Sequence, residues 1–183
     1  MMDRRRLLML APLVGAVAAG GGFWAMLQGL KSGTFDPRGV PSPIVGQRAP
    51  AFDLPDQAPG RGFSSADLAS GRPLLLNFFA SWCVPCAQEH PNLMALQRTG
   101  LPIWAIAYKD GVDKAEAFIR THGDPYARIG RDAPGRVAID WGISGVPESF
   151  LVDATGTIRW HWAGPLDADT IQARLEPALR ALA

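Results

Sequence analysis

The sequence predicts an α/β domain, in which a parallel βαβ half is followed by a ββα half, behind an N-terminal segment that crosses a membrane. Three observations support this fold class. Two apolar runs, at residues 74–80 and 103–108, are separated by a helical stretch, which is typical of parallel strands joined by a crossover helix. A turn signal at residues 153–156 separates two further short strands, and residues 7–30 carry no charged side chain.

The uncharged segment at residues 7–30 directly follows three arginines at positions 4–6. About 20 apolar residues span a bilayer as a helix, and basic flanks stay in the cytoplasm, so the C-terminal remainder should lie outside it. The small residues at 16–18 resemble a cleavage site, so a removed signal peptide is the alternative. Because the apolar run continues through residues 23–27, we favour a retained, single-pass anchor.

Composition divides the chain into three parts. Residues 1–30 are expected to form the cytoplasmic N-terminus and transmembrane anchor, residues 31–50 a proline- and glycine-rich tether, and residues 51–183 one domain. Residues 1–30 hold three of the 18 basic and one of the 17 acidic side chains, so the remainder is nearly neutral. It has no basic stripe, which argues against nucleic acid as a partner.

The first half of the domain reads as alternating strands and helices. Residues 74–80 and 103–108 are almost continuously apolar, as expected for strands buried on both faces. Residues 84–97 are expected to form a helix kinked at Pro91, and residues 113–122 a second helix. This order implies parallel strands with right-handed crossovers.

The last third of the chain changes character. Strands at 148–152 and 157–163 flank the Asp-Ala-Thr-Gly turn at 153–156 and should pair as an antiparallel hairpin. Asp167 then caps a final helix, which Pro177 interrupts. A parallel βαβ half joined to this ββα half gives a central mixed sheet and a thioredoxin-like arrangement.

The chain has two cysteines, Cys83 and Cys86, placed where the strand at 74–80 turns into the first helix. The amides and the dipole at a helix N-terminus stabilise a thiolate, and Pro85 suits the first helical turn. Cys83 should therefore attack a substrate, and Cys86 should resolve the mixed disulfide. A zinc site would need two more ligands, but the three histidines are scattered, and a purely structural disulfide across two residues would constrain the unfolded chain very little.

Two motifs are specific enough to show a family resemblance. One is Asn-Phe-Phe-Ala-Ser-Trp-Cys-Val-Pro-Cys at 77–86, followed by Glu-His-Pro at 89–91. The other is Gly-Ile-Ser-Gly-Val-Pro-Glu-Ser-Phe at 142–150, followed by Leu-Val-Asp at 151–153. From about residue 45 onward, the chain resembles the CcmG (DsbE) family, the membrane-anchored thioredoxin-like proteins of cytochrome c maturation.

This resemblance implies an extracytoplasmic thiol-disulfide oxidoreductase, a reductant of the haem-site cysteines of apocytochrome c. It implies apocytochrome c or the haem-ligation machinery as partner and a membrane thiol carrier as electron donor. It also implies a location in the cell inner membrane, with the catalytic domain on the periplasmic side. No cofactor is expected besides the redox-active Cys83–Cys86 disulfide, and no metal. The alternatives are a general periplasmic reductase or isomerase and a copper-binding assembly factor, although the latter usually spaces its cysteines by three residues.

Two glutamates fall on family active-site positions. Glu89 lies three residues after Cys86 on the same helix face, and Glu148 follows Pro147, which faces the cysteine pair in this fold. If ionised beside the sulfurs, both would disfavour the thiolate and make the centre a reductant. The alternative, judged from residue type alone, is that both glutamates are solvated on the surface and do not affect the cysteines.

The substrate groove is expected around Trp82, as a lid over the site, and around Val146 and Pro147. The Val146–Pro147 bond should be cis, so that the backbone of Val146 can pair with a substrate strand. Two departures stand out: Ser144 replaces an aromatic residue common in the family, and Asn77 stands where general thioredoxins have a buried proton-accepting Asp. Another group must therefore take up that proton. His161 is expected to be structural.

Overall fold

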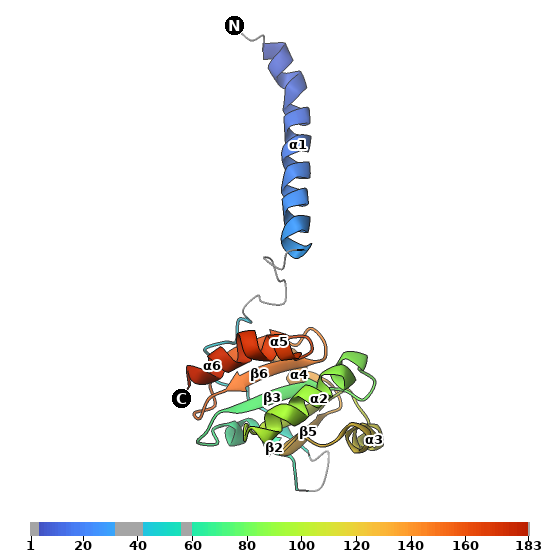
Figure 1. Ribbon diagram of the computed structural model, residues 1–183, viewed down its shortest axis with the longest axis vertical. Helices are drawn as coiled ribbons and strands as arrows, with labels where there is room; N and C mark the ends of the chain where they lie inside the picture. Colours follow the sequence, from blue (N-terminus) through green and yellow to red (C-terminus); the bar gives the residue numbers. More distant parts are fainter. Residues whose placement is uncertain (1–3, 32–41, 56–59, 183) are drawn as a thin grey trace. The chain divides into compact units, whose positions relative to one another are not determined.

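The computed structural model describes residues 4–31, 42–55 and 60–182. The chain splits into two compact units, residues 1–40 and 41–183. The first unit contains one long helix, α1 (Arg4–Lys31), which includes the predicted anchor at residues 7–30 (Figure 1). Among the described residues, no helix is long and apolar enough to cross a membrane. The anchor therefore stays a prediction.

The second unit is built on a five-stranded mixed sheet in the order β5-β4-β3-β6-β7. Strand β3 (Leu74–Phe79) is central, and it pairs in parallel with β4 (Ile103–Tyr108) and antiparallel with β6 (Glu148–Val152). Strand β7 (Ile158–Ala163) completes the predicted hairpin with β6. The mixed sheet and the thioredoxin-like fold class are thus confirmed.

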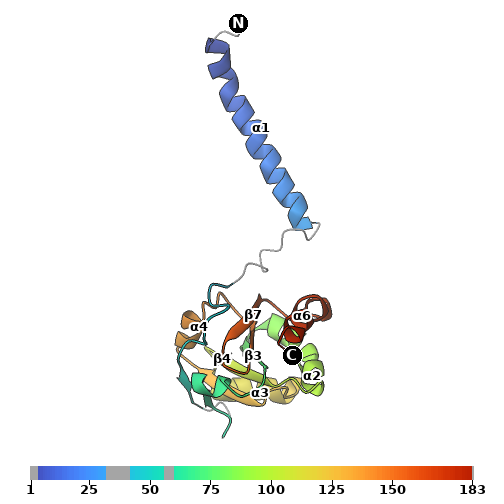
Figure 2. The same cartoon turned by 90° about the vertical axis from the view of Figure 1, so that its left-hand side faces the viewer.

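Helices cover both faces of the sheet. One face packs against α2 (Val84–Arg98), α3 (Val112–His122) and the C-terminal helical segment, through side chains that include Leu93, Phe118 and Leu175. The opposite face packs against α4 (Arg136–Asp140) and contains Trp141. Figure 2 shows α4 on the other side of the strands from α2 and α6. Alternate residues of β3 face these two layers, so every side chain of this strand is buried.

The C-terminal helical segment begins as predicted, because the Asp167 side chain accepts a hydrogen bond from the Thr170 amide. It comprises a short α5 (Ala168–Thr170), a π-helical turn (Ile171–Leu175) and α6 (Glu176–Arg180). Pro177 is the second residue after the π-helical turn. Proline has no amide hydrogen to donate to a carbonyl of the preceding turn, and the wider π-helical turn accommodates this missing hydrogen bond.

Sequence reasoning missed several elements. Strand β5 (Arg128–Asp132) adds a third parallel strand beside β4, although its arginines break the apolar pattern. Two short paired strands, β1 (Asp53–Leu54) and β2 (Phe63–Ser64), and a 3₁₀ turn (Ser65–Leu68) also precede β3.

The folded domain begins before residue 51, where we had placed its start. The Gly46 amide donates to the Ile158 carbonyl, the Ala49 amide donates to the Gly156 carbonyl, and Arg48 forms a bridge with Thr157. These bonds hold the end of the predicted tether against the β6–β7 hairpin. Of that tether, residues 32–41 lie outside the described residues.

Candidate active site

Cys83 and Cys86 form a disulfide at the start of α2. Cys83 is the N-cap residue of this helix, and its sulfur accepts a hydrogen bond from the Cys86 amide at 3.1 Å. Both cysteines are buried, with 5% of Cys83 and 1% of Cys86 exposed. When the pair is reduced, the amides at the helix start favour a thiolate on Cys83 over one on Cys86, which lies a turn further in.

The loop that leads into Cys83 is held by a buried carboxylate, that of Asp110, at the carboxyl end of β4. Asp110 accepts hydrogen bonds from the Ser81 amide at 2.5 Å, from the Ser81 hydroxyl at 2.9 Å and from the Gly111 amide at 2.9 Å. Strands β3 and β4 run parallel, so their carboxyl ends meet at the same edge of the sheet. Asp110 thereby fixes the backbone two residues before the first cysteine.

A second loop approaches the disulfide from the other side. The peptide bond between Val146 and Pro147 is cis, as predicted, and the Val146 carbonyl oxygen lies 3.4 Å from the Cys83 sulfur. The Pro147 carbonyl accepts a hydrogen bond from the Gly164 amide at 2.9 Å, which ties this loop to the end of β7. The predicted groove residues Val146 and Pro147 therefore lie at the cysteine pair.

Glu89 is buried one turn after Cys86, with 1% of the residue exposed. Its carboxylate accepts hydrogen bonds from the Asn77 amide group at 3.0 Å and from the Leu166 backbone amide at 2.8 Å. Burial raises the pKa of Glu89 to about 7, because desolvation outweighs these two hydrogen bonds. Near neutral pH this carboxyl can therefore both accept and release a proton.

Asn77 connects Glu89 to two other buried side chains. Its amide nitrogen donates to Glu89 and to the Ser149 hydroxyl, and its oxygen accepts from the Tyr126 hydroxyl at 3.3 Å. Burial, together with the charges of Glu89 and Asp124, keeps the pKa of Tyr126 well above its usual value, so this phenol stays protonated. Asn77 cannot take up a proton itself, but it is hydrogen-bonded to Glu89, which can.

Glu148 does not join this group. In β6 it pairs with Phe78 of β3, so its side chain shares the sheet face of Phe78 and Phe150, opposite to α2. Our expectation that Glu148 lies beside the sulfurs is wrong, because consecutive residues of a strand point to opposite faces. Its carboxylate instead accepts from the Ser144 amide and hydroxyl, both at 2.7 Å, and forms a hydrogen bond with His161 at 2.6 Å.

The environment of Glu148 also differs from that of Glu89. Burial alone would raise the pKa of Glu148, but the hydrogen bonds from His161 and Ser144, together with the charge of His161, lower it below its usual value. Glu148 is therefore an ionised carboxylate whose oxygens are hydrogen-bonded to Ser144 and His161. The partner of His161 is Glu148, whose other carboxylate oxygen binds the loop at Ser144 and Gly145.

Apolar side chains project into solvent beside the buried disulfide. Trp82 is 58% exposed and Val84 is 69% exposed, and the Trp82 ring lies 6.4 Å from that of Tyr108. Trp82 is thus an exposed aromatic residue at the rim of the site, and its role as a lid stays a prediction. Such a rim can bury apolar area against a partner.

The AhpC/TSA family matches residues 45–161 of this chain. The thiol:disulfide interchange protein HelX of Rhodobacter capsulatus is 41% identical over 173 residues, which cover 94% of this chain and 95% of HelX. The chain belongs to the AhpC/TSA family, in its DsbE (CcmG) branch. This DsbE-family chain is a thiol-disulfide oxidoreductase, as its resemblance implied.

Two further comparisons agree with this assignment. The thiol:disulfide interchange protein DsbE of Allochromatium vinosum is 40% identical over 143 residues, covering 78% of this chain and 79% of that protein. The crystal structure of a thioredoxin-family thiol:disulfide interchange protein from Chlorobium tepidum superposes with a TM-score of 0.58 at 29% identity, covering 78% of this chain and 99% of that one.

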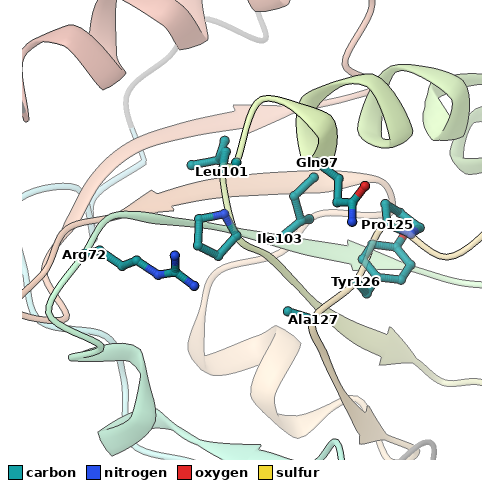
Figure 3. A pocket seen from close by; sticks show the side chains of 9 residues that line it. Arg72, Gln97, Leu101, Ile103, Pro125, Tyr126 and Ala127 are labelled. Atoms are coloured by element: carbon teal, nitrogen blue, oxygen red, sulfur yellow. The ribbon is translucent and has the colours of Figure 1, made fainter.

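A pocket of about 200 Å³ lies away from the disulfide of this DsbE-family protein. Arg72, Gln97, Leu101 and Tyr126 are among its lining residues, and Figure 3 shows them around the amino ends of β3 and β4. The cysteines lie at the opposite, carboxyl end of β3. Among the described residues, no group of three or more His, Cys, Asp or Glu side chains is placed to hold a metal ion.

Sequence reasoning missed two residues that shape the active site of this DsbE-family chain. Asp110 directly follows Tyr108-Lys109 at the end of a predicted parallel strand, and that position could have marked it as a loop-binding carboxylate. The other residue is His161, which the sequence predicts only to be structural. Its role depends on the pairing of β6 with β7, which places it diagonally across from Glu148 on one face.

Proposed function

We propose that this DsbE-family protein reduces the disulfide between the haem-site cysteines of apocytochrome c, on the outer side of the cell inner membrane. Buried Glu89, next to the resolving cysteine and with a pKa of about 7, carries the proposal. A carboxyl with that pKa suits proton exchange with a thiol near neutral pH. When ionised, it also opposes a buried thiolate, which disfavours the reduced state and makes the couple more reducing.

The reaction begins when the Cys83 thiolate attacks one sulfur of the substrate disulfide. A bond forms between Cys83 and that sulfur, and the other substrate sulfur leaves as a thiolate. The Cys86 thiol then passes its proton to Glu89, and its thiolate attacks Cys83. This step forms the Cys83–Cys86 disulfide and releases the second substrate thiolate, so two electrons have moved from the protein to the substrate.

The loop at residues 145–147 presents the substrate in this scheme. The backbone of Val146 lies at the Cys83 sulfur, and an extended substrate segment can pair with it as an added strand. Trp82 and Val84 supply exposed apolar contacts at the rim. The protein needs no cofactor besides its own cysteine pair, and a membrane thiol carrier returns it to the dithiol form.

The location is part of the same proposal. Residues 7–30 anchor the chain in the inner membrane as a single span, and the arginines at 4–6 keep the N-terminus in the cytoplasm. The catalytic domain then lies on the periplasmic side, where disulfides form and a dedicated reductant is needed.

The test is to trap substrates with Cys86→Ser, which removes the resolving thiol and should leave partners bound to Cys83. We expect mixed disulfides with c-type apocytochromes, or with proteins that bind their haem-site cysteines. Cys83→Ser is the matched control and should trap none of them. Capture of many unrelated periplasmic proteins would instead indicate a general reductase or isomerase.

A further inference from the structure

Glu148 and His161 lie on the sheet face opposite to the cysteines, yet their hydrogen bonds lead to the active site. One carboxylate oxygen of Glu148, Oε1, accepts from the Ser144 amide at 2.7 Å, the Ser144 hydroxyl at 2.7 Å and the Gly145 amide at 3.2 Å. The next residue is Val146, whose carbonyl oxygen lies 3.4 Å from the Cys83 sulfur. A single buried carboxylate thus binds two consecutive amides immediately before the residue that touches the nucleophile.

His161 holds that carboxylate in place. Its Nε2 lies 2.6 Å from the second oxygen of Glu148, Oε2, and it must be the donor because an ionised carboxylate can only accept. The side chains are buried, with 9% of His161 and 3% of Glu148 exposed. The imidazole ring also packs on Phe150, with 4.5 Å between the ring centroids. The orientation of the Glu148 side chain is therefore fixed from both ends.

The segment before Val146 is rich in glycine. Gly142 and Gly145 flank Ile143 and Ser144, and glycine leaves the backbone with more conformations than any other residue. Gly142 is in the left-handed region, with a φ of 67°. The bonds from the Ser144 and Gly145 amides to Glu148 restrict this freedom directly before Val146.

We propose that Glu148 and His161 act together as positioning residues, which hold residues 144–146 so that the backbone of Val146 stays at the Cys83 sulfur and can receive a substrate strand. Neither residue touches the reacting sulfurs. The inference rests on the thiol-disulfide exchange of this protein and not on the identity of its substrate. It gives His161 a positioning role and Glu148 a role other than setting the thiol's charge.

This role predicts different effects on two reactions of Cys83. Reduction of a peptide disulfide needs the Val146 backbone as a docking strand. It should therefore slow when the hydrogen bonds that join His161, Glu148 and residues 144–145 are lost. Alkylation by a small reagent such as iodoacetamide needs only the thiolate. The partial negative charge of the nearby carbonyl disfavours that thiolate, so a displaced loop should leave the alkylation rate unchanged or raise it.

The experiment compares reduced full-length wild-type protein with His161→Phe, which keeps the ring that packs on Phe150 but removes the N–H donor. We expect kcat/KM for a disulfide-bonded model peptide to fall about tenfold or more, since small misplacements near a reacting group have effects of this size. The iodoacetamide rate of Cys83 should not fall. His161→Gln, which restores a donor near the Nε2 position, should recover most of the peptide rate, and Glu148→Ala should behave like His161→Phe.

The matched control is Arg159→Gln, which removes a different side-chain contact of the same hairpin, the ion pair between Arg159 and Asp153 at 2.6 Å. It should leave both rates unchanged. The proposal is overturned if folded His161→Phe and Glu148→Ala reduce the peptide at the wild-type rate, or if both reactions slow equally. A substrate other than apocytochrome c would refute the proposed function, but it would not affect this comparison.

Discussion

Replacing Glu89 by Gln should abolish a pH dependence of stability that the buried carboxyl creates. The pKa of Glu89 is about 7 in the folded protein, against 4.5 for an exposed glutamate. Between these values the folded state binds the proton more tightly than the unfolded state, so the free energy of unfolding falls as pH rises. A difference of about 2.5 between the two pKa values corresponds to roughly 3.4 kcal/mol in total, of which about 2.5 kcal/mol is lost between pH 5 and pH 8.

The substitution can keep the local hydrogen bonds. The glutamine oxygen can accept from the Leu166 amide, and its NH₂ group can donate to Asn77 if that amide rotates by half a turn. Tyr126 can then accept from the rotated Asn77, because a phenol oxygen both donates and accepts. Gln cannot ionise, so the destabilisation by a buried charge disappears at high pH.

The assay is urea unfolding of the oxidised full-length protein at pH 5 and pH 8. We expect the wild type to lose about 2.5 kcal/mol more than Glu89→Gln across this range. The burial-lowered pKa of His90 gives a slope of opposite sign, but it is present in both proteins and cancels in the difference. Glu116→Gln, at an exposed helix pair with Arg120, should keep the wild-type slope. Equal slopes in wild type and Glu89→Gln would refute the account of this carboxyl as a proton exchanger.

Three further outcomes follow from the site and the chain. With limiting iodoacetamide near neutral pH, mass spectrometry of the reduced protein should find label on Cys83 first; faster labelling of Cys86 would reverse the assignment of the nucleophile. Asp110→Ala leaves the Ser81 and Gly111 amides without their carboxylate, so urea unfolding should show a loss of about 1–3 kcal/mol and peptide disulfide reduction should slow; wild-type values for both would contradict a loop-holding role. The full-length protein should stay with membranes after alkaline extraction, whereas a soluble mature form that begins near residue 19 would exclude a retained anchor.

The cysteine pair and the central strands could be predicted because their signals are local. The strand at 74–79 is recognisable from continuous apolarity, and Cys83 from its place at a strand-to-helix turn. The hairpin follows from its turn residues, and the structure keeps its bounds to within one residue. Strand β5 was missed because Arg128 and Arg131 interrupt its apolar residues at the edge of the sheet.

The glutamates show where sequence reasoning ends. Spacing placed Glu89 on the face of Cys86, but its burial depends on Leu166 and Asn77, which come from distant parts of the chain. Glu148 was assigned to the wrong face, since adjacency to Pro147 reveals proximity along the chain and not the side to which a strand residue points. Likewise, proline and glycine content suggested a tether through residue 50, while backbone pairing with the hairpin decides where the domain begins.

The direction of electron flow tests the central claim most directly. Reduced full-length protein would be mixed in equal amounts with a disulfide-bonded haem-site peptide containing Cys-x-x-Cys-His, and the redox state of both would be read by mass spectrometry after acid quenching. The account predicts that the peptide becomes a dithiol while the protein acquires the Cys83–Cys86 disulfide, with no such transfer from Cys83→Ser. If oxidised protein instead converted the reduced peptide to its disulfide, the protein would be an oxidant, and the role assigned to it here would be wrong.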